Sequence, residues 1–166
     1  RIEGKDYIDY ELSKAFAMVD HQIAHIYIEP GYEDEVSQVI KNKNLGTVLD
    51  STLQKELKIN HSKSGNLILC ADINSWFNYY WWDDVKYAPD FTFSVDIHRK
   101  PGYDPLELFF DFKTKQISHD TSLIKGSHGL IPTDDDLPLI GTSFNSNLDK
   151  IITVTDIKKL IEIFFK

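Results

Sequence analysis

The chain has 166 residues, of which 42% are hydrophobic, 13% aromatic and 27% charged. This length suits one compact domain or two small ones with a sizeable core, and the composition excludes intrinsic disorder and collagen-like repeats. Because 18 Lys and Arg stand against 26 Asp and Glu, the formal net charge is −8. Nucleic-acid binding needs clustered basic residues along one face, so nucleic acid is excluded as a partner. The single cysteine, Cys70, excludes an intrachain disulfide framework and is expected to be a small buried hydrophobic residue.

The apolar runs and the first residues of the chain bear on membrane association and on whether the chain belongs to a longer protein. No apolar run reaches the roughly 18 residues that span a bilayer, so no membrane segment is expected. The first residue is Arg1, and the only methionine, Met18, lies inside an apparently structured segment. We therefore expect residues 1–166 to be a single domain or fragment of a longer protein, whose compartment the sequence leaves unknown.

The first half of the chain predicts a hairpin, two short helices and a buried strand. Residues 13–19 and 23–29 could form one amphipathic helix or two hairpin strands, and the alternation of Ile26 and Ile28 with polar neighbours favours the hairpin. Acidic residues at 33–35 begin a helix that extends to about residue 41, and Asp50 caps a second helix over 53–57. The continuous apolar run 66–71 predicts a strand covered on both faces.

The second half alternates aromatic and polar segments. Residues 76–82 hold six aromatic side chains in seven positions and fit no single period. Residues 91–98 alternate apolar and polar side chains, which predicts a strand, and 99–105 form a loop stiffened by two prolines. A further strand is expected over 139–144. Thr155 and Asp156 cap a closing helix with an apolar stripe, and the whole pattern predicts an α/β (mixed α and β) fold.

Three groups of residues could carry chemistry. His128 lies in a glycine-flanked turn, which allows close approach of a metal, although a structural, hydrogen-bonding histidine is the commoner interpretation of that residue alone. On the expected strand, Asp96 and His98 would share a face, where a carboxylate-oriented imidazole acts as acid, base or ligand, or the two simply pair. In the aromatic run, Tyr79, Tyr80 and Trp82 are candidates for stacking on a ligand, with core packing as the alternative.

The later part of the chain holds, in order, the segment from Lys125 to Gly129, an acidic loop, the run Leu137–Gly141 and a closing helix. This order resembles the end of an alkaline phosphatase superfamily enzyme and is similar to nucleotide pyrophosphatases/phosphodiesterases. Residues 8–10, 13–17, 26–28, 88–90 and 96–105 also resemble stretches of that family.

The resemblance implies two zinc ions about 4 Å apart that flank a phosphoryl group, with His128 as the last zinc ligand. It also implies that the chain is the C-terminal part of an alkaline-phosphatase-like fold, a mixed sheet with flanking short helices. The chain has no Asp-x-x-x-His, and its Asp-His pair, Asp20 and His21, is followed by Gln22 rather than glycine and lies in a predicted turn. The nucleophile and most ligands are therefore expected upstream of Arg1.

These expectations define a function and a rival. The parent protein is expected to be a zinc-dependent hydrolase of small phosphate esters, to which this chain supplies one metal ligand and no catalytic residue, so that the chain alone is inactive. The pocket candidates are Tyr79, Tyr80, Trp82, Asp96 and His98. The alternative is a non-catalytic α/β binding module in which the aromatic run and Tyr103 hold a carbohydrate, nucleotide or protein partner.

Overall fold

The computed structural model describes residues 1–102, 104–132, 140–143, 152, 154 and 156–165. The chain divides into two compact units, Arg1–Ile131 and Pro132–Lys166. Helices and strands occur together, which confirms the mixed α and β class. Tyr103, most of the run Leu137–Gly141, and Thr155 lie outside the described residues.

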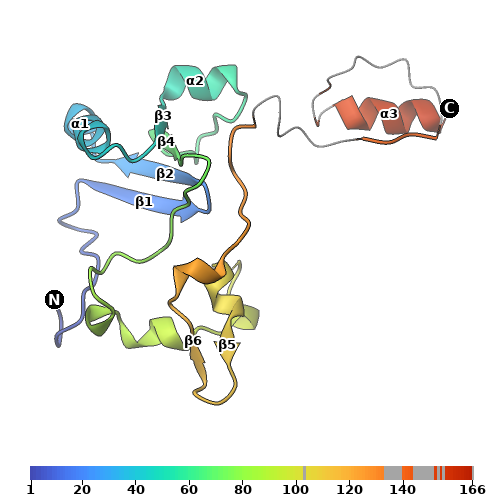
Figure 1. Cartoon of the computed structure of the whole chain (residues 1–166). Helices are drawn as coiled ribbons and strands as arrows, with labels where there is room; N and C mark the ends of the chain where they lie inside the picture. The colour runs from blue at the N-terminus through green and yellow to red at the C-terminus, as the bar shows by residue number, and fades with distance from the viewer. Residues whose placement is uncertain (103, 133–139, 144–151, 153, 155, 166) are drawn as a thin grey trace. The chain divides into compact units, whose positions relative to one another are not determined.

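A four-stranded sheet in the order β1-β2-β4-β3 organises the first unit (Figure 1). Its strands are β1 (Ala15–Asp20), β2 (Ile23–Ile28), β3 (Thr47–Leu49) and β4 (Leu67–Cys70). All three pairings are antiparallel, so this sheet is not the expected mixture of parallel and antiparallel strands. β2 and β3 run in the same direction with β4 inserted between them, because each pairs antiparallel with β4.

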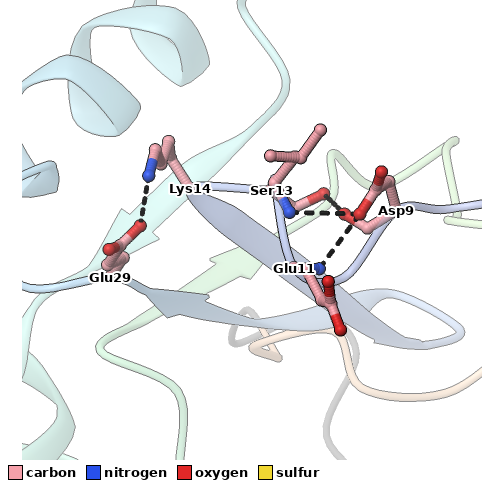
Figure 2. A network of polar contacts seen from close by, with 6 residues as sticks. Asp9, Glu11, Ser13, Lys14 and Glu29 are labelled. Carbon is pink, nitrogen blue, oxygen red and sulfur yellow. Dashed lines mark hydrogen bonds and ion pairs between the residues drawn. The ribbon is translucent and has the colours of Figure 1, made fainter.

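The predicted hairpin is confirmed. Asp20 pairs with Ile23 across a two-residue turn, and His21 in that turn has a left-handed backbone with φ of 59°. At the other end of the hairpin, the Lys14 ammonium and the Glu29 carboxylate lie 2.8 Å apart (Figure 2). Just before β1, the Asp9 side chain accepts hydrogen bonds from the backbone N–H groups of Glu11 and Leu12. The Lys14–Glu29 ion pair therefore closes the open end of the hairpin.

Two short helices connect the remaining strands of the sheet. α1 (Glu33–Lys43) leads from β2 to β3 and ends at Asn44 in a left-handed conformation. α2 (Ser51–Glu56) leads from β3 to β4, and the Asp50 carboxylate accepts hydrogen bonds from the N–H groups of Thr52 and Leu53, as the sequence predicted. The strand β3 was not predicted, because three residues are too few to show a period.

The core lies on both faces of the sheet. On one face, Ile26, Leu69 and Ile40 of α1 belong to one buried apolar cluster. On the other face, Ile68 and Cys70 pack with Leu49 of β3. The strand β4 is therefore covered on both sides, and the prediction of a buried Cys70 is confirmed by its 4% exposure.

The segment 84–123 of the first unit is built from short 3₁₀ helices rather than from the strand predicted over 91–98. The five helices are η1 (Val85–Tyr87), η2 (Asp90–Phe93), η3 (Ile97–Arg99), η4 (Pro105–Leu108) and η5 (Thr121–Leu123). A two-stranded antiparallel hairpin, β5 (Phe110–Asp111) and β6 (Gln116–Ile117), lies between η4 and η5 (Figure 1).

The strand prediction over 91–98 was wrong because local capping overrides the alternating pattern. The Asp96 carboxylate accepts a hydrogen bond from the N–H of His98 at 2.9 Å and begins η3. Asp84, Asp104 and Asp120 begin η1, η4 and η5 in the same way. Aspartate side chains favour such turns over a strand ladder because they satisfy the first backbone N–H groups locally.

The second unit contains the predicted closing helix, α3 (Asp156–Phe164). Leu160 of its apolar stripe is 4% exposed, whereas Ile161 is 54% exposed. In the strand expected over 139–144, residues 140–143 have no strand structure, and residues 139 and 144 lie outside the described residues. No helix in the described part of the chain combines the length and apolar character that crossing a membrane requires.

Candidate metal site and aromatic cavity

The tip of the β1–β2 hairpin meets the glycine-flanked segment that contains His128. The backbone N–H of Gln22 donates a hydrogen bond to the carbonyl oxygen of His128 at 2.9 Å. Gly129 has a φ of +98°, and a Cβ atom there would lie 3.2 Å from the Ile23 side chain. A glycine at this position therefore permits both the left-handed backbone and the close approach to β2.

This contact brings three possible metal ligands together. One ligand atom each of Asp20, His21 and His128 lies within 4.8 Å of the other two. The His21 and His128 rings stack with centroids 3.9 Å apart, and His128 Nε2 lies 3.8 Å from Asp20 Oδ1. The Asp20 and His128 side chains are 60% and 62% exposed, so the cluster is open to solvent on one side.

His21 is the most constrained member of the cluster. Its Nδ1 is hydrogen-bonded to Ser127 Oγ at 2.8 Å, and its carbonyl oxygen accepts a hydrogen bond from the N–H of Phe77 at 2.7 Å. Burial, and then the neighbouring His128, lower the pKa of His21 below its ordinary value. A lowered pKa keeps the imidazole neutral, which is the form that binds a metal, and the bond at Nδ1 leaves Nε2 as its ligand atom.

The three side chains offer donor types that could hold one metal ion. Two imidazoles and a carboxylate are the ligand types that zinc uses in catalytic sites, where three protein ligands leave a fourth position open. Ligand atoms on one tetrahedral zinc ion lie about 3.3–3.5 Å apart, since each metal bond is about 2.0–2.2 Å long. The 3.8 Å separation of Asp20 and His128 is close to that spacing.

The sequence singled out His128 but assigned no ligand role to Asp20 and His21. The pair was set aside because Gln22 follows it and because it lies in a turn, and the structure does place it at the tip of the hairpin. The local sequence shows only an acid and a histidine next to each other in a tight turn. Nothing in the local sequence shows that residues 126–129 return to this turn.

Asp96 and His98 do not form the pair that was expected on one strand face. Both residues are exposed, and the Asp96 carboxylate contacts the backbone of His98. The expected carboxylate-oriented imidazole depended on the strand, which is a 3₁₀ helix here. The structure therefore corrects this part of the predicted site, because the carboxylate serves as a helix cap.

The three aromatic candidates line one cavity. Tyr79, Tyr80 and Trp82 are among the side chains around a space of about 420 Å³, together with residues of η2, η4 and β6. The Tyr80 and Trp82 rings stack at 4.8 Å, and the Trp81 ring meets Trp82 edge to face at 5.1 Å. Burial is the main reason why the pKa values of the Tyr79 and Tyr80 hydroxyls are raised.

His119 packs against aromatic rings that line this cavity. Its imidazole stacks on Phe93 at 4.3 Å and lies 4.8 Å from the Tyr80 ring, while Nε2 is 3.2 Å from the Thr92 carbonyl oxygen. Sequence reasoning assigned no role to His119, whose Nδ1 is buried without a hydrogen-bond partner.

Comparison with known proteins gives no family or fold assignment: no protein-family model, curated protein or solved structure matches the chain.

Proposed function

We propose that the chain is part of a zinc-dependent hydrolase of phosphate esters, in which Asp20, His21 and His128 hold a zinc ion. The observation that carries the proposal is the convergence of one ligand atom from each of these three residues within 4.8 Å. The resemblance of Lys125–Gly129 to the nucleotide pyrophosphatase/phosphodiesterase end supports the same reaction class. A zinc ion held there would supply positive charge to a phosphoryl group.

The surroundings of the cluster suit a phosphate ester. A cavity of about 340 Å³ is lined by Gln22, Lys125, Gly126 and Ser127, which are neighbours of the proposed ligands. The Lys125 ammonium supplies a local cation in a chain whose formal net charge is −8. An acidic protein can bind an anionic substrate when a metal ion and one nearby cation outweigh the overall field locally.

Ser127, Gln22 and Asp20 have separate tasks in this proposal. Ser127 holds Nδ1 of His21 and so orients its ring, while the hydrogen bond from Gln22 holds the backbone at His128. Asp20 supplies the negative charge that two neutral imidazoles lack. The nucleophile, and the ligands of a second zinc ion, would come from a segment outside residues 1–166, so the chain alone is predicted to be inactive.

Zinc binding tests the site directly. We expect the 166-residue chain to bind about one zinc ion, and His21→Gln or His128→Gln to weaken binding at least about tenfold because each removes a ligand. His61→Gln is the matched control, since His61 is exposed and lies outside the cluster. Competition with a chromophoric chelator measures the affinities. Equal zinc affinity in all three variants would refute the metal site.

Hydrolysis tests the reaction class. A longer protein that contains this chain should cleave bis(4-nitrophenyl) phosphate in a chelator-sensitive way, and His128→Gln should lower kcat/KM by about two orders of magnitude or more. His61→Gln should leave the rate unchanged. A zinc-loaded longer protein without phosphoesterase activity would contradict the proposed reaction while leaving the zinc site intact.

A second candidate function is ligand binding without catalysis. The observation that favours it is the cavity of about 420 Å³ lined by Tyr79, Tyr80 and Trp82. Rings gathered around a cavity of ligand size are typical of binding sites for small molecules. This function would need neither zinc nor a nucleophile, so it would survive the loss of zinc binding.

A further inference from the structure

The aromatic cavity combines rings with carboxylates, and this combination indicates the charge of its ligand. Tyr79, Tyr80, Trp81 and Trp82 form one side of the lining. The lining also includes three charged residues, Lys100, Asp104 and Glu107. Its volume of about 420 Å³ lies in the range of about 300–1,000 Å³ that is usual for small-molecule sites.

The rings do not form a single flat stack. Tyr80 and Trp82 are inclined by 26°, whereas Trp81 and Trp82 are inclined by 78°. The cavity is therefore bordered by rings in different orientations, which suits a rounded group better than one planar ring. An alkylated ammonium group is rounded, and aromatic faces attract it through the negative potential of their π-systems.

Among the described residues, the Asp104 carboxylate of the lining forms no ion pair, and the only charges that favour its ionised form are the longer-range ones of His21 and Lys100. Lys100 Nζ lies 2.8 Å from Glu107 Oε2, and these two charges offset each other. Asp104 is 7% exposed, and its Oδ1 accepts a hydrogen bond from the backbone N–H of Leu106 at 2.9 Å. Burial raises the pKa of the Asp104 carboxyl, which shows that its charge is poorly solvated. A cationic ligand would offset that cost, whereas an anionic ligand would add to it.

We propose that this cavity binds an organic cation whose ammonium carries alkyl groups, with the aromatic rings against the alkyl groups and Asp104 as the source of charge. This site shares no residue with Asp20, His21 and His128, so it goes beyond the proposed zinc function and does not depend on it. The second candidate function, ligand binding without catalysis, would then have organic cations as its ligand class. Nucleotides and other phosphate-bearing ligands are disfavoured in this cavity.

Choline and its neutral isostere 3,3-dimethyl-1-butanol test the proposal without any mutation. Titration of the 166-residue chain at constant ionic strength, without zinc, should give a saturable change in tryptophan fluorescence with choline. The isostere has the same shape without the charge, so it should bind at least about tenfold more weakly. Equal affinity for the two compounds would overturn the proposal in favour of a purely apolar pocket, and so would the absence of saturation with choline.

Two variants and one control variant test which residues bind the ligand. Asp104→Asn keeps an oxygen that can accept the Leu106 N–H bond but removes the charge, so choline affinity should fall about tenfold while isostere affinity stays the same. Trp82→Leu should weaken both compounds, and Trp76→Leu, outside the cavity, should weaken neither. Circular dichroism establishes that each variant is folded. Unchanged choline affinity in a folded Asp104→Asn protein would contradict the assigned source of charge.

Discussion

The sheet and the aromatic 3₁₀ segment of the first unit are held by different kinds of interaction. In the sheet, aliphatic side chains such as Ile68 and Leu69 are almost fully buried on opposite faces, and backbone ladders join the strands. Between residues 84 and 123, four of the five short helices are capped by an aspartate side chain, and aromatic rings such as Phe93 and His119 stack beside them. Burial therefore decides the structure of one region and side-chain capping that of the other.

The difference also explains where the possible sites occur. Short helices cannot bury a continuous stripe, so the rings around them enclose the cavity of about 420 Å³. The proposed zinc ligands lie where the sheet ends, at the hairpin tip, because a turn can present Asp20 and His21 to another segment.

The largest effect should come from the core of the sheet. Ile68 is 2% exposed, so Ile68→Ala should lower the free energy of unfolding by about 2–5 kcal/mol, through lost burial and a cavity. Ile73 is 59% exposed and follows the same strand, so Ile73→Ala is the matched control and should cost less than about 0.5 kcal/mol. Urea unfolding measures both changes. Similar costs for the two variants would show that burial does not stabilise this region.

A smaller effect is expected from a helix cap in the aromatic segment. Asp96→Ala removes the acceptor for the His98 N–H and should cost about 1 kcal/mol, whereas Asp96→Asn keeps an acceptor and should cost a few tenths. His98→Ala tests the alternative in which the Asp96 and His98 side chains pair, because such a pair would make this substitution as costly as Asp96→Ala. Thermal unfolding of the three variants distinguishes the helix cap at Asp96 from a side-chain pair between Asp96 and His98.

The smallest effect should be a pH dependence of stability at Asp104. Burial raises the pKa of this carboxyl in the folded protein above its ordinary value. The folded state therefore binds the proton more tightly, and the stability that it contributes is present below about pH 4 and is lost as pH rises through the raised pKa. Relative to Asp104→Asn, the native protein should lose stability as the pH rises above about 4, which urea unfolding at several pH values measures. A difference in the free energy of unfolding between the two proteins that does not change with pH would contradict the raised pKa of Asp104.

Much of the sheet region could be predicted from the sequence, because its signals are local. The alternation around Ile26 and Ile28 indicates a strand, Asp50 indicates a helix start, and the apolar run up to Cys70 indicates a covered strand. Each signal depends on neighbours within a few residues. Residues 91–98 also alternate apolar and polar side chains, but they do not form a strand, because Asp96 caps a 3₁₀ helix there.

The candidate sites were predictable only in part. His128 was recognised from its flanking glycines, and Tyr79, Tyr80 and Trp82 from their density in the sequence. Asp20 and His21 were not assigned as ligands, because their partner lies about a hundred residues away; the His21–Ser127 bond alone spans 106 positions. No periodicity reports a contact of that separation.

Local sequence signals were enough to predict the mixed class of the fold, the hairpin, the helices α1 and α2, and the burial of Cys70. The three-dimensional packing was needed to show that Asp20 and His21 meet His128, that Asp96 caps a helix, and that Asp104 lines a cavity with aromatic rings. The physical reason is range: propensity and capping act over a few residues, whereas ligand clusters and cavities form when packing brings distant segments together.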